Sequence, residues 1–408
     1  MVNIIPFKAL RPEQQYVKQV ASKPYDVLTS SEAKIESQGK PNSFLHVTKS
    51  EIDLPENTEP HSQKVYDKAK QNLDAFISRN ILFKENKACY YIYLLVMNGH
   101  SQTGLVCCSS VDDYENGLIK KHEFTRPDKE LDRINHIKAT GAQTGNVFLA
   151  YKYLSEIDNI IEDWKKERSP AYDFIADDNI HHSIWIVNDE KTIIKISDLF
   201  KNKVACTYIA DGHHRAASAA KVRIYFGANS THANYFLTTL FPSNQLKIMD
   251  YNRVVKDLNG LTESDFLQKV EENFTLEKTP EAFLPSEPHT FGMFINNQWY
   301  KLSAKKDIDL QDPIAVLDIT VLQENLLHPI LGIGDQRTDK RIDFIGGIRG
   351  LTELEKRVNS GEMAVAFSLY PVSIQQLFDI ADSDNIMPPK STWFEPKLRD
   401  GLLTHLII

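Results

Sequence analysis

The stretch Tyr208-Ile209-Ala210-Asp211-Gly212-His213-His214-Arg215, followed by the small-residue run Ala216–Ala220, decides how this part of the chain folds. Apolar residues from Val204 to Ile209 predict a strand, Asp211-Gly212 predicts a turn, and the alanines predict a helix. The first turn of a helix has unpaired backbone N–H groups and partial positive charge, so it attracts anions. The sequence therefore indicates a phosphate-binding turn. A structural turn with two solvated histidines explains the same residues, and the pattern alone leaves both interpretations open.

The chain has 408 residues, which is too long for one ordinary core, so we expect two or three domains. Its 42% of hydrophobic and 25% of charged residues are typical of soluble proteins. A formal net charge of -8 argues against mainly electrostatic binding to nucleic acid. No stretch reaches the ~20 apolar residues of a membrane span. Because the N-terminus also lacks a secretory pattern, we expect a cytoplasmic protein.

The four cysteines, Cys89, Cys107, Cys108 and Cys206, lie in apolar segments and show no C-x-x-C spacing. A tetrahedral zinc site or a redox pair therefore has no support in the sequence. Buried, reduced thiols are the expected state.

Hydrophobic periodicity divides the chain into two regions. We expect an N-terminal mixed α/β region, residues 1–260, which carries the turn, and a C-terminal α/β region, residues 261–408. Asn98-Gly99 and Asn296-Asn297 each separate two strand-like runs and predict β-hairpins. From Arg341 onward strands and helices alternate, which is typical of an α/β region. The expected helices include residues 61–80, 156–168, 266–274, 351–358 and 373–382.

A second polar cluster runs from Lys120 to Arg133 and leads into a helix predicted at residues 129–140. It offers a carboxylate, a hydroxyl group and several cations, which is the mixture that nucleotide phosphates need. A solvated, salt-bridged helix is the alternative, and most charge runs are of that kind. The side chains expected on one face of this helix are Lys129, Asp132, Arg133 and His136.

Two further segments have ambiguous roles. Residues 386–397 contain three prolines, which exclude a regular helix. This strap either closes an active site, with Lys390, Ser391 or Lys397, or anchors the structure through its aromatic residues, and its composition favours the second role. Gly346–Gly350 follows a predicted strand and precedes a helix, and a permissive turn is favoured there over an anion cradle.

Taken together, these segments resemble a bacterial and archaeal family known as domain of unknown function 1015. The turn is also similar to the phosphate-binding turn of the ParB/sulfiredoxin-like superfamily, which includes free serine kinases that make O-phosphoserine. The resemblance implies a mixed α/β fold with a ParB/sulfiredoxin-like nucleotide-binding core. Sulfiredoxin has a catalytic Cys where this chain has His213 or His214, so sulfinic-acid reduction is not expected. The segments that carry the family resemblance are residues 23–28, 102–104, 119–133, 210–216 and 387–402.

The resemblance implies a nucleotide-dependent phosphotransferase that acts on a small hydroxyl amino acid, with free L-serine as the first choice. Mg2+ with ATP or ADP would be the cofactor and the phosphate donor. Asp211 would hold Mg2+ or act as the base, and Glu123 is the second candidate base. Asp26 is a weaker candidate for the same pocket. The candidate catalytic residues are Asp211, Glu123 and His214, and the candidate nucleotide-binding residues are Gly212, His213, Arg215, Thr125, Lys129 and Arg133.

Other classes of function remain open at this stage. A non-catalytic nucleotide or metabolite sensor would keep the phosphate turn without the chemistry, and a scaffold would use residues 386–397 for docking. A metal-dependent hydrolase built on His213, His214 and Glu123 has weaker support. The expected partners are a nucleotide and a small molecule, with neither nucleic acid nor membrane, and a homo-oligomer is left open.

Overall fold

The structure is a computed structural model that describes residues 1–227, 230–305 and 308–408. The chain forms two compact units, unit 1 (residues 1–246 and 396–408) and unit 2 (residues 247–395). The mixed α/β class expected from the sequence is confirmed, since both units combine helices with a sheet. The sequence-based division at residue 260 assigned the whole C-terminal part to a second region, whereas residues 396–408 pack within unit 1.

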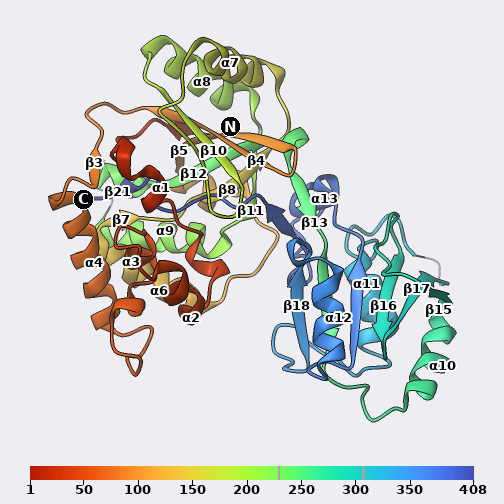
Figure 1. Cartoon of the computed structure of the whole chain (residues 1–408). Coiled ribbons are helices and arrows are strands. Elements are labelled where there is room, and N and C mark those ends of the chain that lie inside the picture. The colour runs from red at the N-terminus through yellow and green to blue at the C-terminus, as the bar shows by residue number, and fades with distance from the viewer. Residues whose placement is uncertain (228–229, 306–307) are drawn as a thin grey trace. The chain divides into compact units, whose positions relative to one another are not determined.

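A nine-stranded mixed sheet is the framework of unit 1 (Figure 1). Its strands are β1 (Ile4–Ile5), β4 (Tyr90–Met97), β5 (His100–Ser110), β6 (Ile119–Lys120), β8 (Val147–Tyr151), β9 (Tyr172–Ile175), β10 (His181–Val187), β11 (Thr207–Asp211) and β12 (Tyr235–Pro242). They pair in the order β6-β11-β8-β12-β5-β4-β10-β9, and β1 also pairs with β5. Short pairs join β2 (Leu10–Pro12) to β3 (Leu82–Lys84), and β7 (Ala142–Gln143) to β21 (His405–Leu406).

Nine α-helices surround this sheet in the described part of unit 1. They are α1 (Val17–Val20), α2 (Ser30–Ser37), α3 (Leu45–Thr48), α4 (Gln63–Ser78), α5 (Val111–Glu115), α6 (Pro127–Thr140), α7 (Ser155–Glu167), α8 (Glu190–Lys203) and α9 (His213–Phe226). Helices α7, α8 and α9 all contribute residues to the core cluster that packs on the sheet, and α6 packs against α9 (Figure 1). Local chemistry explains the ends of α6, because Pro127 starts it and Gly141, at φ 65°, ends it in a left-handed conformation.

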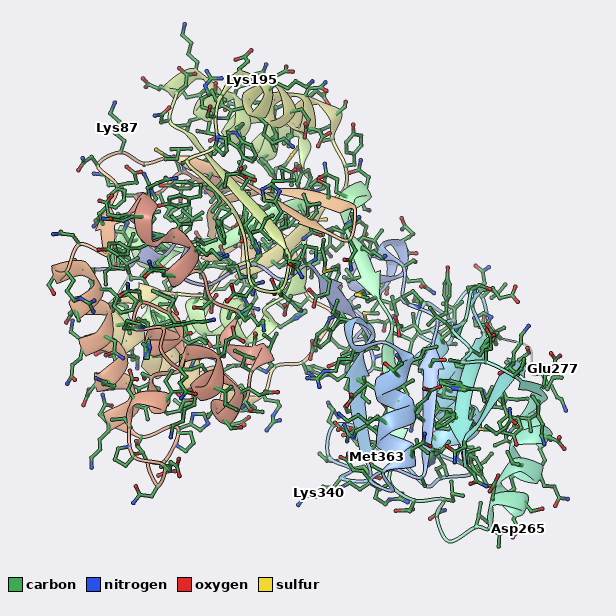
Figure 2. All side chains as sticks on the ribbon, in the orientation of Figure 1. Lys87, Lys195, Asp265, Glu277, Lys340 and Met363 are labelled. Carbon is green, nitrogen blue, oxygen red and sulfur yellow. The ribbon has the colours of Figure 1, made fainter. Side chains whose placement is uncertain are left out.

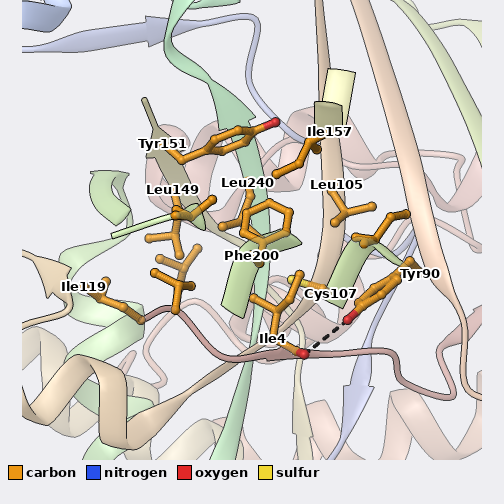
Figure 3. Packing of buried hydrophobic residues seen from close by; sticks show 14 of the residues in the cluster. Ile4, Tyr90, Leu105, Cys107, Ile119, Leu149, Tyr151, Ile157, Phe200 and Leu240 are labelled. Carbon is orange, nitrogen blue, oxygen red and sulfur yellow. Dashed lines mark hydrogen bonds between the residues drawn. The ribbon is translucent and has the colours of Figure 1, made fainter. Parts of the chain in front are cut away.

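The main core of unit 1 lies between the sheet and helices α7, α8 and α9. Tyr90 of β4, Leu105 of β5 and Leu149 of β8 pack with Phe200 of α8 and Ile157 of α7 (Figure 3). Burying each such apolar side chain contributes about 1.5–3 kcal/mol. The Tyr90 hydroxyl group donates a hydrogen bond of 3.1 Å to the carbonyl oxygen of Ile4, which ties the N-terminal strand to this core.

Both predicted hairpins are present. Met97 pairs with His100 across Asn98 and Gly99, whose φ values are 50° and 77°. In unit 2, Asn296 and Asn297 have φ values of 47° and 60° between two strands. Two successive residues at positive φ form the tight turn that matches strand twist, which is why Asn and Gly predicted these positions correctly.

Unit 2 contains a six-stranded sheet in the order β15-β17-β16-β19-β14-β18, and β13 pairs separately with β20. The strands are β13 (Lys247–Met249), β14 (Tyr251–Val255), β15 (Phe274–Thr279), β16 (Thr290–Ile295), β17 (Gln298–Ala304), β18 (Ile342–Gly346), β19 (Val365–Leu369) and β20 (Trp393–Glu395). The helices are α10 (Glu263–Asn273), α11 (Asp318–Leu322), α12 (Leu351–Asn359) and α13 (Ile374–Asp382). Charged side chains such as Lys195 in unit 1 and Asp265 in unit 2 extend outward from their own units (Figure 2).

The Pro-rich strap has a structural role in unit 2. Trp393 stacks on Tyr251 with ring centroids 5.1 Å apart. The buried Arg253 donates to the carbonyl oxygens of Pro389 and Lys390 at 3.2 and 3.0 Å. The Gly346–Gly350 turn is not an anion cradle, because the Asp250 carboxylate occupies the space beside Gly347 where a Cβ would lie.

The cysteine side chains are free thiols, three of them fully buried. Cys89, Cys107 and Cys108 are buried, Cys206 is half-buried, and all four are free. Burial raises the pKa of Cys107 to about 12, although its hydrogen bonds with Thr238 and Ser109 act to lower it. In the described ranges, no helix combines the length and the apolar character that crossing a bilayer requires.

Gly104 on β5 offers a test of this packing. An added Cβ would lie 2.6 Å from Cγ2 of Thr239 and 2.7 Å from Cζ of Phe241, both on the neighbouring strand β12. Gly104→Ala should therefore lower the free energy of unfolding by about 1–3 kcal/mol. Urea denaturation measures the loss, and Ser101→Ala at an exposed position of the same strand is the matched control. Equal midpoints for the two variants would contradict the packing described.

Candidate functional site

The predicted strand, turn and helix around Asp211 are confirmed. Strand β11 ends at Asp211, Gly212 has φ 98°, and α9 begins at His213. The pairing of β11 with β8 shifts register between Ile209 and Asp211, a bulge that changes the direction of the following side chains. Two features require glycine at position 212. Its φ is left-handed, and a Cβ there would lie 3.0 Å from Nε of Arg215.

Arg215 is buried beside this glycine and pairs with two carboxylates. Its Nη2 lies 3.3 Å from Oδ2 of Asp26 and 3.4 Å from Oδ1 of Asp211, and Nη1 donates to the carbonyl oxygen of Asn146. Burial alone would lower the pKa of Arg215, but the charges of Asp26 and Asp211 raise it above its ordinary value. The guanidinium is thus held in its charged form. Its Nε has no partner among the described residues.

Asp211 also binds a cation from the end of the chain. Nζ of Lys397 donates to Oδ2 of Asp211 at 3.0 Å. Burial would raise the pKa of Asp211, but Lys397 and Arg215 together hold it well below its usual range. A carboxylate stabilised in this way is a weak proton acceptor. Of the three strap residues considered from the sequence, Lys397 therefore joins the turn, whereas Lys390 and Ser391 belong to unit 2.

Glu123, predicted from the second polar cluster, lies beside the turn. Its Oε2 is 3.6 Å from Nδ1 of His213, and its side chain is 43% exposed. The His213 ring packs edge-on against His122, with centroids 4.5 Å apart. Burial, followed by the neighbouring His122, lowers the pKa of His213 well below its ordinary value, so His213 is neutral at pH 7. Its Nε2 has no hydrogen-bond partner within the described ranges.

The segment before α6 is attached to α9 by His214 and Glu130. The backbone N–H of Arg126 donates to Nε2 of His214 at 2.9 Å. Thr125 and Lys221 both donate to the Glu130 carboxylate. In these contacts the lone pair of His214 and the hydroxyl group of Thr125 hold the segment before α6 in place. Sequence segments that lie about 90 positions apart are thereby brought together, as the two-cluster hypothesis requires.

The remaining two predicted residues lie on α6, farther along the same segment. Lys129 is exposed in the first turn of the helix. Arg133 is buried, donates to Oδ2 of Asp132 at 2.8 and 2.6 Å, and lies 4.0 Å above the ring of Tyr25. Arg133 therefore faces Tyr25, on the side of the turn occupied by Asp26.

A cavity joins Arg133 to Arg215. The volume open to water inside it is about 30 Å³, and its polar lining residues are Tyr25, Arg133, His136, Gln143, Thr144 and Arg215. Both arginines are nine-tenths buried. Two guanidinium groups therefore converge on one cavity, although they come from different predicted clusters.

Asp400 is the buried carboxyl group that sequence reasoning missed. Its Oδ1 lies 3.5 Å from the position of a Cβ on Gly145, and its Oδ2 has no partner in the described part of the chain. Burial raises the pKa of Asp400 to about 8, despite the opposing charge of Arg215. Nothing in the local sequence distinguishes this aspartate from a surface residue, because only the return of the tail to unit 1 buries it.

The metal role predicted for Asp211 has limited support in the geometry. Within residues 1–227, 230–305 and 308–408, no three His, Cys, Asp or Glu side chains are grouped closely enough to hold a metal ion. Both oxygens of Asp211 already face cations. This arrangement does not fit a resident metal at Asp211, because a second cation would compete with Lys397 and Arg215.

The comparison with protein families identifies the chain. The family described as Protein of unknown function (DUF1015) matches residues 4–320. The chain belongs to the DUF1015 family. The family expected from the sequence is thus confirmed, and Lys397 and Asp400 of this DUF1015 protein lie outside the matched range. The chain matches none of the curated proteins.

Solved structures show distant similarity. A free serine kinase in complex with AMP is 13% identical, with 76% of this chain and 92% of the kinase covered at a TM-score of 0.35. A conserved hypothetical protein from Pyrococcus furiosus is 14% identical, with coverages of 76% and 93% at a TM-score of 0.35. SbnI from Staphylococcus aureus, with a C-terminal truncation, is 12% identical, with coverages of 73% and 86% at 0.33. These similarities are too distant to assign an activity to the DUF1015 chain.

Asp400 gives the site a measurable pH dependence. The folded protein keeps a proton on Asp400 up to about pH 8, whereas the unfolded chain releases it near pH 3.9. Because the folded state binds the extra proton, the free energy of unfolding falls as pH rises through this window. Asp400→Asn cannot ionise, so the variant should become more stable than the wild type as pH approaches 8.

Urea denaturation at pH 5, 6, 7 and 8 measures this difference. The buried histidines titrate in both proteins and cancel in the comparison. Asp198→Asn, at an exposed position of α8, is the matched control and should follow the wild type at each pH. Parallel curves for Asp400→Asn and the wild type would show that Asp400 is ionised in the folded protein.

Proposed function

We propose that this protein binds a nucleotide at the N-terminus of α9 and transfers a phosphoryl group to a small hydroxyl amino acid, with free L-serine as the first acceptor to test. The observation that carries the proposal is the convergence of three chain segments at one helix N-terminus. Arg215 comes from the helix itself, Glu123 from the segment before α6, and Lys397 from the tail. The similarity of the Asp211–Arg215 turn to a known phosphate-binding turn agrees with this arrangement.

The phosphate groups would bind at the turn. Backbone N–H groups in the first turn of α9 carry partial positive charge, and Gly212 permits a close approach. Arg215 and Lys397 add two charged donors, which stabilise the charge that develops on a transferring phosphoryl group. The Asp26 side chain is 36% exposed, so water reaches its contact with Arg215 and a phosphate can replace this carboxylate.

Glu123 is the preferred base for the acceptor hydroxyl group. It is more exposed than Asp211 and faces a neutral histidine, whereas Asp211 faces Lys397 and Arg215. In the proposed step the Glu123 carboxylate takes the hydroxyl proton, the acceptor oxygen bonds to the terminal phosphorus, and the bond to the nucleotide's leaving oxygen breaks. Mg2+ would accompany the nucleotide phosphates, because it is usually held by substrate phosphates with few protein ligands.

Phosphorus NMR with L-serine, Mg2+ and either ATP or ADP tests this proposal directly. The wild type should produce an O-phosphoserine signal. Glu123→Gln should lower the rate by about 10²–10⁴-fold, since it removes the base and keeps the shape of the side chain. Arg215→Lys should weaken nucleotide binding, because lysine cannot make the forked contacts of arginine.

Glu190→Gln is the matched control for the base, because Glu190 is exposed on α8 and makes no contact with the turn. It should retain the wild-type rate. A Glu123→Gln variant with full activity would exclude Glu123 as the base. The absence of O-phosphoserine with both nucleotides would exclude the serine kinase.

A non-catalytic sensor of nucleotides or metabolites is the second candidate function. The ion pairs of Asp211 favour it, since they leave the turn rich in phosphate-binding groups and poor in proton acceptors. A sensor should be stabilised against heat by the nucleotide through mass action while the nucleotide stays intact. Thermal unfolding with and without ADP, followed by phosphorus NMR of the same samples, separates the two functions.

A further inference from the structure

The cavity beside Gly145 has the chemistry of a site for anions. Arg133 and Arg215 line it, and none of its described lining residues is Asp or Glu. The apolar part of the lining includes Phe236 and Leu237. A small molecule that enters this cavity therefore meets positive charge at one part and hydrocarbon at another.

Gln143 adds a hydrogen-bond donor to the two cations. The backbone N–H of Leu237 donates to Oε1 of Gln143 at 2.8 Å, which fixes the orientation of the amide. The Nε2 group of Gln143 consequently has the role of donor at the wall of the cavity. Nε of Arg215 is buried and has no partner among the described residues. Because a buried donor without a partner costs about 1–3 kcal/mol, this group needs an acceptor from water or from a ligand.

The two arginines are held in place before any ligand arrives. Arg133 is fixed by Asp132 and by the ring of Tyr25. Arg215 is fixed by the carbonyl group of Asn146 and packs over Gly212. Because the two arginine side chains are already ordered, they lose little further conformational entropy when a carboxylate binds.

We propose that this cavity is a carboxylate subsite, in which Arg133, Arg215 and Nε2 of Gln143 bind the carboxylate of the phosphoryl acceptor. The inference rests on the proposed function and narrows it, because it makes the carboxylate the recognised group and the amino group dispensable. Hydroxy acids are then ligands of the same site as hydroxyl amino acids, whereas amino alcohols are excluded.

Isothermal titration calorimetry of the full-length protein without nucleotide tests the subsite. The three ligands all carry a hydroxyl group. L-serine has both a carboxylate and an amino group, glycerate has only the carboxylate, and ethanolamine has only the amino group. Serine and glycerate should bind with similar affinity. Ethanolamine should bind on the order of 10- to 100-fold more weakly, because it makes none of the charge-assisted hydrogen bonds.

Gln143→Glu is the informative variant. Its carboxylate can still accept from the Leu237 N–H group, so the fold is kept, but it places negative charge in the cavity. The variant should lose at least about tenfold in affinity for glycerate. Gln14→Glu makes the same change in charge at an exposed position of unit 1 and should bind as the wild type does.

The outcomes separate this inference from the proposed function. The subsite would be overturned by equal binding of ethanolamine and serine, or by unchanged binding of glycerate to the Gln143→Glu variant. The absence of binding heat for all three ligands would also overturn it. Binding of serine and glycerate without any phosphoryl transfer would support the subsite and count against the kinase. Transfer to ethanolamine would support a kinase and overturn the subsite.

Discussion

A guanidinium group that is removed from water must be paired with acceptors. In unit 1, three chain segments meet at Arg215 and supply these acceptors. Its partners are the Asp26 carboxylate, the Asp211 carboxylate and the carbonyl group of Asn146. They come from the N-terminal segment, the end of β11 and the segment that precedes β8. Removing one partner of a buried pair typically costs about 3–5 kcal/mol, so the three segments are held together at the turn. The same requirement keeps positive charge at the N-terminus of α9, where a phosphate would bind.

The tail of the chain completes this arrangement. Residues 396–408 belong to unit 1, although unit 2 separates them from the rest of that unit in sequence. Lys397 pairs with Asp211, the backbone of Asp400 pairs with Ser22, and β21 pairs with β7. Unit 2 is thus an insertion between β12 and the tail. The charge balance of the turn is reached only when the last residues of the chain have packed.

Local chemistry explains the parts of the fold that could be predicted. Asn98-Gly99 and Asn296-Asn297 adopt positive φ, which few other residues tolerate, so the hairpins were evident. Pro127 and Gly141 mark the ends of α6 for similarly local reasons. The contact between Glu123 and His213 could not be predicted from the sequence alone. Contacts between residues some 90 positions apart depend on how strands β6 and β11 pair. Lys397 could not be distinguished from Lys390, since both are lysines of one Pro-rich segment.

The sequence by itself determined the strand, the glycine turn and the helix at Asp211–Arg215, as well as the family of the chain, because these depend on the order of neighbouring residues. The tertiary structure decided which charges meet there. It placed Lys397 against Asp211, joined Arg133 to Arg215 in one cavity, and buried Asp400 near both. The physical reason is that pairing and desolvation depend on distance in space. Backbone preferences act over a few residues, whereas the energy of a buried charge depends on every segment that surrounds it.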